Sequence, residues 1–312
     1  MFVDGVGAGA ADAASNPLAR GEFLLSRFAD GSGAALPGGG GAALLDARLG
    51  VPGRPQSATG QATLLTGENA PALLGRHLLG FPDRTLRELL ERRSIFRRLA
   101  AGGLRAAFAN AYPVAHLRGL GIEVEGEPEL ALRRRPRASA TTVAFAAGGG
   151  RFRTFADARE GAALTHDLTA DRAAALGIAL PRRTPEEAAG VLLALARGVD
   201  LAAFEFYLTD EAGHARSMEL ALEALERLDR FLRALVAGLA SGDALLVTSD
   251  HGNVEDLSHR NHTLAPVPLL GFGSAAGRVA ELRDLTGVAP LLLELAGLPR
   301  ELQGLAGGDP GG

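Results

Sequence analysis

Residues 244–253 have the sequence Ala-Leu-Leu-Val-Thr-Ser-Asp-His-Gly-Asn. The first five are apolar or β-branched, which predicts a short buried strand. Asp250 and His251 follow this strand directly, and both side chain types are common metal ligands. Because ligands of open α/β sheets bind at the carboxyl ends of parallel strands, we expect a polar site at this edge of a sheet.

Segments of alternating helix and strand character surround this stretch and indicate an α/β fold. One helix start is predicted by the capping-box pair Thr85 and Glu88, and another by Thr184-Pro185-Glu186-Glu187, where Pro suits the first turn and Thr184 can cap it. Apolar residues spaced three and four apart predict a long amphipathic helix from Met218 to Leu239. Further strands are predicted at residues 2–3, 106–109, 204–209 and 267–271, a short helix from Ser57 to Gly67, and a closing helix at 284–297.

Residues 112–184 differ from the flanking sequence in composition. They contain short strand-like pieces at Ile122–Val124 and Thr142–Phe145 and many small residues. We predict that this segment is a small inserted α+β cap. Residues 1–111 and 185–312 then form a three-layer core with a mainly parallel sheet.

Composition excludes several classes of function. The chain has 312 residues and a formal net charge of -4, so it lacks the positive field of nucleic-acid or anionic-membrane binders. It contains no cysteine, which excludes disulfides and thiolate metal sites. No apolar run has the length of a membrane span, and the first residues do not resemble a signal peptide. We therefore predict a cytoplasmic protein without nucleic-acid or membrane partners.

The carboxylates and imidazoles that follow the predicted strands suit Zn, Mn or Mg at a hydrolytic centre. Two such ions can promote phosphoryl transfer and activate a serine hydroxyl. Ser57 precedes a short helix whose free N–H groups favour an anion, and Gly60 is predicted to allow close approach of a phosphate. Thr59 is the alternative hydroxyl in this turn. The candidate ligands are Asp4, Asp210, His214, Asp250, His251 and His262, with His259 as an alternative third imidazole.

Five motifs, in the same order as in the family, resemble the alkaline phosphatase superfamily. Within it, they are similar to the metalloenzyme branch that contains cofactor-independent phosphoglycerate mutase and phosphopentomutase. The motifs are Phe-Val-Asp-Gly-Val-Gly at 2–7, Ser-Ala-Thr-Gly-Gln at 57–61, Thr-Asp-Glu-Ala-Gly-His at 209–214, Ser-Asp-His-Gly-Asn at 249–253, and Asn-His-Thr with Pro-Val-Pro at 261–268.

The resemblance implies two divalent metal ions and a phosphoseryl intermediate on Ser57. One ion would bind Asp4, Ser57 Oγ, Asp250 and His251, and the other would bind Asp210, His214 and His262. The implied partner is a small phosphorylated substrate, and the implied reaction is hydrolysis or mutase chemistry on a phosphate monoester.

The chain departs from bacterial phosphoglycerate mutases of this branch in three ways. Its cap is smaller, it has no lysine, and its serine motif continues Ala-Thr-Gly-Gln instead of Glu-Val-Gly-His. A phosphodiesterase or phosphonate hydrolase is therefore a second hypothesis, and a non-catalytic metal-binding protein a third. The sequence leaves open the oligomeric state and the roles of His77, Asn110, His116 and His166.

Overall fold

A computed structural model describes residues 1–132 and 134–299. The strands are β1 (Phe2–Val3), β2 (Gly41–Leu45), β3 (Ala106–Phe108), β4 (Ala111–Tyr112), β5 (Arg153–Thr154), β6 (Leu201–Ala203), β7 (Glu205–Phe206), β8 (Ala244–Thr248) and β9 (Val267–Gly273). The helices are α1 (Ser57–Thr66), α2 (Ala70–Leu74), α3 (Arg84–Arg93), α4 (Ile95–Ala101), α5 (Val114–Gly119), α6 (Ala140–Ala147), α7 (Phe155–Arg159), α8 (Asp171–Ala175), α9 (Pro185–Ala196), α10 (Leu208–Ala215), α11 (Met218–Ala237) and α12 (Val288–Leu295).

The central sheet has the strand order β2-β9-β8-β1-β7. Strands β7, β1 and β8 are parallel neighbours, whereas β9 pairs antiparallel with both β8 and β2. Strand β6 lies one residue before β7 in the chain and pairs in parallel with β3 in a separate two-stranded sheet. The predicted α/β fold with a mainly parallel sheet is confirmed, and β9 is the strand that runs against it.

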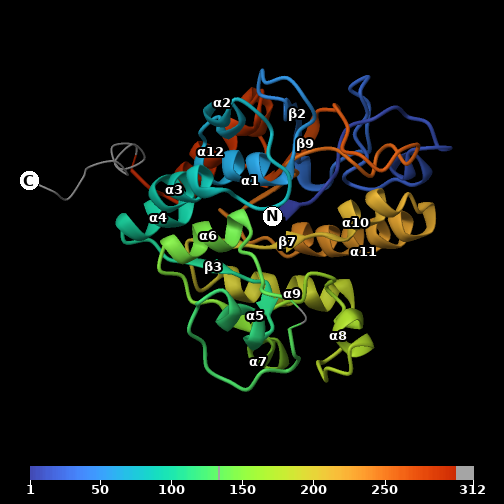
Figure 1. Cartoon of the computed structure of the whole chain (residues 1–312). Helices are drawn as coiled ribbons and strands as arrows, with labels where there is room; N and C mark the ends of the chain where they lie inside the picture. Colours follow the sequence, from blue (N-terminus) through green and yellow to red (C-terminus); the bar gives the residue numbers. More distant parts are fainter. Residues whose placement is uncertain (133, 300–312) are drawn as a thin grey trace, which may run out of the picture.

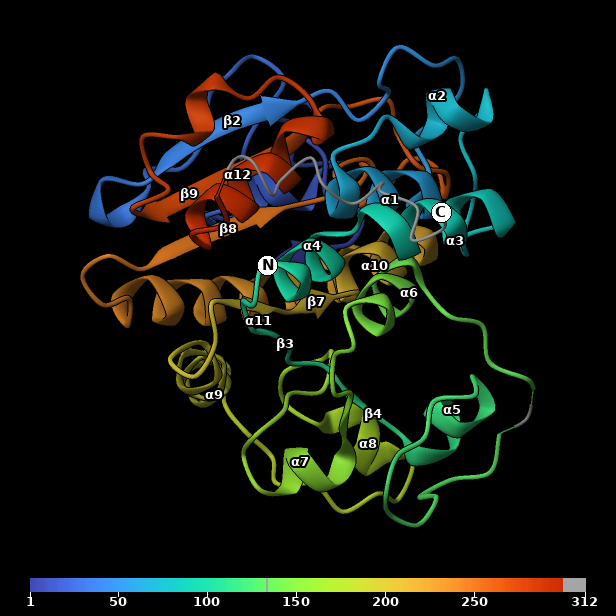
Figure 2. The same ribbon diagram turned by 90° about the vertical axis from the view of Figure 1, so that its left-hand side faces the viewer.

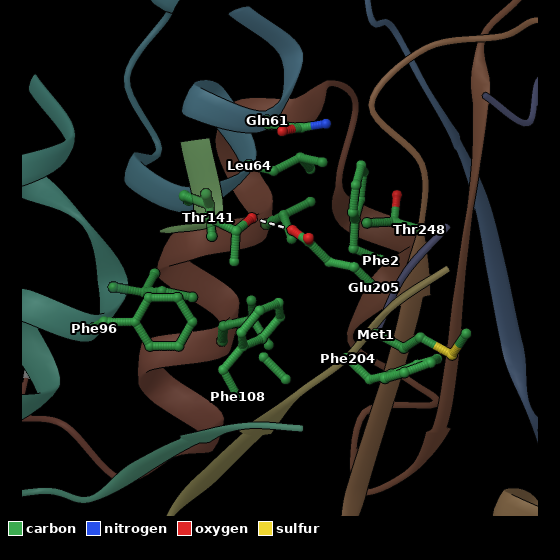
Figure 3. A pocket seen from close by; sticks show the side chains of 15 residues that line it. Met1, Phe2, Gln61, Leu64, Phe96, Phe108, Thr141, Phe204, Glu205 and Thr248 are labelled. Atoms are coloured by element: carbon green, nitrogen blue, oxygen red, sulfur yellow. Dashed lines mark hydrogen bonds between the residues drawn. The ribbon is translucent and has the colours of Figure 1, made fainter. Parts of the chain in front are cut away.

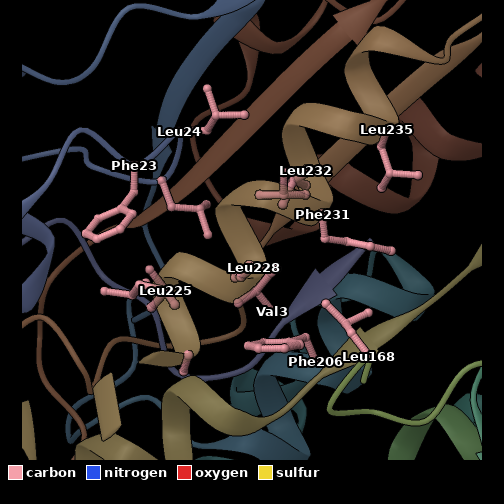
Figure 4. Close-up of a cluster of buried hydrophobic side chains, with 14 of the residues drawn as sticks. Val3, Phe23, Leu24, Leu168, Phe206, Leu225, Leu228, Phe231, Leu232 and Leu235 are labelled. Carbon is pink, nitrogen blue, oxygen red and sulfur yellow. The ribbon is translucent and has the colours of Figure 1, made fainter. Parts of the chain in front are cut away.

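Helices cover both faces of the sheet, which gives three layers (Figures 1 and 2). On one face, α11 places Leu228, Phe231 and Leu232 against the buried sheet residues Val3 and Phe206 (Figure 4). These α11 residues belong to the apolar stripe predicted from the sequence. Their burial explains why a helix with so many charged residues on its other side is stable here.

The opposite face carries α1 and α12. Helix α1 packs against α3 and α6, and the buried residues Ala58, Leu86, Phe96 and Phe145 share one apolar cluster. Helix α6 lies within the segment predicted as a cap, yet it belongs to the layer that holds α1 in place. The remaining part of that segment forms the lobe with α5, α7 and α8 below the sheet (Figure 2). The boundaries 1–111, 112–184 and 185–312 stay a prediction.

Two strand predictions in residues 112–184 are wrong. Thr142–Phe145 lies inside helix α6, because the Ser139 hydroxyl accepts from the backbone N–H of Thr142 and caps the helix. Burial against α3 and α4 then outweighs the local strand preference of Thr142 and Val143. Ile122–Val124 forms no strand in the described part of the chain; Ile122 and Val124 pack against an apolar cluster instead.

One helix-start prediction is right and one is wrong. The Thr184–Glu187 capping box is present at the start of α9. The Thr85–Glu88 pair is not a cap, because α3 begins at Arg84 and Asp83 accepts from Leu86 N at 3.0 Å. A carboxylate two residues upstream thus replaces the predicted threonine cap. Among the helices within residues 1–132 and 134–299, none is long and apolar enough to span a bilayer.

Candidate metal centre

Strand register brings Asp4 and Asp250 together. Phe2 of β1 pairs in parallel with Thr248 of β8, and each carboxylate follows its strand two residues after this pair. Parallel neighbours end at the same edge of a sheet, so both side chains emerge side by side. Asp250 and His251 are fully buried, and Asp4 is 8% exposed. This confirms the expected polar cluster at the carboxyl edge.

The first ligand group consists of Asp4, Asp250 and His251. His251 Nε2 lies 3.5 Å from Asp4 Oδ1 and 3.3 Å from Asp250 Oδ2. Ser57 is the first residue of α1, and its Oγ lies 2.9 Å from the same nitrogen. The predicted nucleophile therefore points at the group that the resemblance assigns to one metal.

A second group consists of Asp210, His214 and His262. Asp210 and His214 lie one turn apart in α10, with Asp210 Oδ2 3.2 Å from His214 Nε2. Asp210 Oδ1 is 3.7 Å from His262 Nε2, and the two imidazoles approach to 3.3 Å between their Nε2 atoms. Asp210 was predicted at a strand end but lies in the first turn of α10, because β7 stops at Phe206.

The two groups adjoin one another. The rings of His251 and His262 are stacked, with centroids 3.6 Å apart and an interplanar angle of 15°. Ligand atoms of Asp210, His251 and His262 also lie within 4.8 Å of one another. His251 is therefore the residue through which Ser57, the first group and the second group meet.

Backbone carbonyls orient two of the imidazoles. His262 Nδ1 lies 3.0 Å from Pro55 O, and His214 Nδ1 lies 2.8 Å from Arg260 O. Since a carbonyl only accepts, Nδ1 carries the proton in both rings, and Nε2 is left to bind a cation in the neutral form. A carbonyl that fixes the ring in this way is the usual outer partner of a metal-bound histidine.

Burial and like charge shape the ionisation of the carboxylates. Burial, together with the charges of nearby carboxylates, raises the pKa of Asp4 and of Asp250 well above the usual range. Burial lowers the pKa of His251 to about 3, so its imidazole is neutral at physiological pH. Although burial alone would raise it, the hydrogen bond with His214 and the charge of His251 lower the pKa of Asp210 to about 2.

The donor set fits divalent cations. Asp4 Oδ1 and Asp250 Oδ1 are buried and have no hydrogen-bond partner among the described residues. Buried carboxylates without compensating partners are costly, and a bound cation would satisfy these oxygens and remove their mutual repulsion. Oxygen and imidazole donors without thiolate suit Zn, Mn or Mg. The role of these residues as ligands stays a prediction.

The alternatives left open by the sequence point away from the cluster. The Thr59 side chain is buried, and its hydroxyl donates to Gln56 O at 3.1 Å and accepts from Leu78 N at 3.3 Å. His259 faces Asp256, with 3.6 Å between Nε2 and Oδ2. Ser57 and His262 are therefore the hydroxyl and the imidazole that the fold presents to the site.

Residues of undetermined role have structural contacts. Asn110 exchanges two hydrogen bonds with the backbone of Glu205, at 2.8 and 2.9 Å, and so fixes the start of β7. His116 stacks on Tyr112, with ring centroids 5.6 Å apart. His77 contacts the Val51 carbonyl at 3.3 Å. His166 lies against Tyr207, with ring centroids 5.8 Å apart.

Glu255 is a functional candidate that the sequence did not reveal. Its buried carboxylate accepts from Gly7 N and from Asn253 N, both at 2.8 Å, and from the Thr263 hydroxyl. These three donors belong to the loops that carry Asp4, His251 and His262. An acidic residue in a polar loop usually indicates a solvated surface, so only the assembled fold reveals this clamp.

Gln61 and Asn253 also contact the carboxylates. Gln61 Nε2 donates to Asp250 Oδ2 at 3.4 Å, and Asn253 Nδ2 donates to Asp210 Oδ1 at 2.6 Å. Both residues lie inside the quoted motifs but were not chosen from sequence as site residues. Asp250 Oδ1 keeps no hydrogen-bond partner among the described residues, whereas the second oxygen of Asp210, Oδ2, lies 3.2 Å from His214 Nε2.

A small apolar cavity of about 70 Å³ lies between α1 and the sheet (Figure 3). Phe96, Phe108 and Phe204 line it, and Glu205 and Thr141 face each other across a hydrogen bond. Burial raises the pKa of Glu205 to about 7. An apolar lining of this kind is unsuited to an anionic ligand.

Gly60 sets the distance between α1 and the turn after β8. A Cβ atom at this position would lie 2.7 Å from Asp250 O and 2.9 Å from Asp250 Cβ. This glycine therefore has a packing role against Asp250, and its predicted role in phosphate approach stays a prediction.

We expect Gly60→Ala to push α1, and with it Ser57, away from His251. Activity should fall at least tenfold, and the free energy of unfolding should fall by about 1–3 kcal/mol, as for other overpacked positions. The matched control is Gly190→Ala in α9, where a Cβ meets nothing within 4 Å and the helix should become slightly more stable. Denaturant unfolding and ester turnover measure both effects, and equal behaviour of the two variants would contradict the packing argument.

Comparison with known proteins places this geometry in context. The family model described as Metalloenzyme superfamily matches residues 184–300. The 2,3-bisphosphoglycerate-independent phosphoglycerate mutase of Cereibacter sphaeroides is 36% identical over 124 residues, which cover 37% of this chain and 24% of that protein. The corresponding enzyme of Agrobacterium fabrum is 37% identical over 113 residues, which cover 34% of this chain and 22% of that protein. The match thus spans about a quarter of these relatives.

Solved structures share the fold over most of the chain. Alkaline phosphatase from the Antarctic bacterium TAB5 has a TM-score of 0.53 and 11% identity, with 96% of this chain and 98% of that chain covered. Thermus thermophilus alkaline phosphatase has a TM-score of 0.52 and 12% identity, with 83% of each chain covered. The fold is therefore alkaline-phosphatase-like, and the resemblance to the metalloenzyme branch of this superfamily, first indicated by the motifs, is confirmed.

Proposed function

We propose that this protein is a metal-dependent phosphoryl-transfer enzyme that acts on small phosphate monoesters. The observation that carries the proposal is the position of Ser57 Oγ, 2.9 Å from His251 Nε2, beside carboxylate oxygens that lack hydrogen-bond partners among the described residues. The similarity to phosphoglycerate mutases over 124 residues, and the match of the metalloenzyme family model to residues 184–300, support the same chemistry.

We assign the ligands as the resemblance implies. Asp4, Ser57 Oγ, Asp250 and His251 would hold one divalent ion, and Asp210, His214 and His262 the other. When bound, such ions stabilise the charge of an in-line phosphoryl transfer and lower the pKa of a coordinated hydroxyl. The identity of the ions stays open among Mn, Zn and Mg.

The chain's own residues position the nucleophile. The N-terminus of α1 places Ser57 beside backbone N–H groups whose dipoles favour an anionic phosphate. Ser57 Oγ would attack phosphorus as the ester oxygen leaves, which gives a phosphoseryl intermediate. Water or a second hydroxyl then takes the phosphoryl group, so the same site supports hydrolysis or mutase chemistry.

A screen separates these reactions. We expect that the protein with Mn, Mg or Zn acts on sugar and glycerate phosphate monoesters, with released phosphate for a hydrolase or isomerised product for a mutase. A phosphate diester in parallel tests the phosphodiesterase hypothesis. Retention of metal without turnover of any ester would favour the non-catalytic protein. The cytoplasmic location stays a prediction.

A further inference from the structure

A surface hollow of about 350 Å³ opens beside the second ligand group, where His214 and His262 form part of its wall. Arg54, Gln56, Arg260 and Asn261 supply the polar remainder. All of these residues lie outside the segment 112–184. This hollow differs in chemistry from the apolar cavity next to Glu205.

Hydrogen bonds connect the backbone at or next to each arginine with the imidazoles. Arg260 O accepts from His214 Nδ1 at 2.8 Å, and Pro55 O, next to Arg54, accepts from His262 Nδ1 at 3.0 Å. Each arginine therefore starts from a backbone position that is fixed relative to the metal centre. Both side chains contribute to the wall of the hollow from these positions.

The hollow is also close to the nucleophile. Gln56 directly precedes Ser57, and the His262 ring stacks on His251, which contacts Ser57 Oγ. A ligand whose phosphate reaches Ser57 can extend past His262 into this hollow.

The positive charges that line the hollow favour an anionic ligand. Two of its lining residues are arginines, and among the described residues that line it none is acidic. Gln56 also lines the hollow, and its side-chain NH₂ group can donate to an anion. Guanidinium groups stay charged at any physiological pH and bind carboxylate or phosphate oxygens in a bidentate manner.

We propose that Arg54 and Arg260 bind a second anionic group of the substrate, which is therefore a phosphate monoester that also carries a carboxylate or a second phosphate. This inference rests on the proposed function and deepens it. It places substrate discrimination on residues that lie outside the predicted cap of residues 112–184.

Two matched substrate pairs test the proposal. 3-Phosphoglycerate and glycerol 3-phosphate differ in a carboxylate, and fructose 1,6-bisphosphate and fructose 6-phosphate differ in a phosphate. We expect the wild type to prefer the more anionic member of at least one pair. In Arg54→Gln and Arg260→Gln, the ratio of kcat/KM values in that pair should fall at least tenfold. The pair that responds identifies the anionic group.

The matched control is Arg84→Gln, since Arg84 is 90% exposed, pairs with Glu88 on α3 and lies outside the hollow. Its ratios should equal those of the wild type. A wild type without preference in either pair, or unchanged ratios in the two variants, overturns the proposal.

A binding measurement separates this inference from the proposed reaction. Calorimetry on Ser57→Ala compares 3-phosphoglycerate with glycerol 3-phosphate, and fructose 1,6-bisphosphate with fructose 6-phosphate, without requiring turnover. The added variant Arg260→Gln should weaken binding of the more anionic ligand at least tenfold, while Arg84→Gln should not. If the wild type turns over no ester, the proposed function fails. The calorimetric affinities still decide whether the hollow binds anions. If Ser57→Ala and the double variant with Arg260→Gln bind the more anionic ligand with equal affinity, the hollow is not its binding site.

Discussion

Ser57→Ala is expected to lower kcat by at least about 10³-fold, because the variant lacks the oxygen that would accept the phosphoryl group. The carboxylates and imidazoles remain in place, since Ser57 is half-buried at a helix start and alanine fits that position without a clash. Bound metal, measured by elemental analysis after gel filtration, should stay close to the wild-type content.

Thr59→Val is the control for the neighbouring hydroxyl. It keeps the shape of the side chain but removes the hydrogen bonds to Gln56 O and from Leu78 N. We expect lower stability, by about 1–3 kcal/mol, with turnover retained. If Thr59→Val lost activity while Ser57→Ala kept it, the assignment of the nucleophile would be wrong.

Asp250→Asn is expected to abolish metal binding and with it the thermal stabilisation by metal. In the wild type, metal at a concentration 100 times Kd should stabilise the folded state by about 2.7 kcal/mol. Asp250 is fully buried, and its Oδ1 has no hydrogen-bond partner in the described part of the chain. Asparagine removes one charge from a cluster in which Asp210 raises the pKa of Asp250, so the metal-free variant should be at least as stable as the metal-free wild type.

Thermal unfolding with and without Mn or Zn measures both effects. Asp256→Asn is the matched control, because Asp256 belongs to the same segment but faces His259 at 3.6 Å. It should keep the full metal-dependent rise in Tm. If the metal-dependent rise in Tm remained in Asp250→Asn, or disappeared in Asp256→Asn, the ion would bind elsewhere.

The sequence predicted which side chains lie together better than it predicted local structure. Asp4, Asp250 and His251 follow strands, and parallel pairing alone brings such residues to one edge. Asp210 and His214 needed only the helical spacing of four residues. The motifs therefore indicated which side chains meet, even though β7 ends earlier than predicted and Asp210 belongs to α10.

The errors arose where tertiary contacts decide. Thr142 and Val143 favour a strand locally, but the Ser139 cap and burial beneath α3 make them helical. Glu255 could not be predicted as a clamp, because its three donors come from segments far apart in the sequence. Likewise, the Gly60 contact with Asp250 depends on how closely α1 approaches β8. Local patterns do not encode such distances.

Helix α6 shares its buried contacts with the helix that begins at Ser57. Residues 140–147 consequently cannot be exchanged between relatives together with the rest of residues 112–184 as an independent module. A chimaera with a foreign insert needs to retain helix α6, or to restore equivalent packing contacts with Ala58 and Phe96. Otherwise the foreign insert would shift α1 and displace Ser57 from His251, in addition to any change in ligand selection.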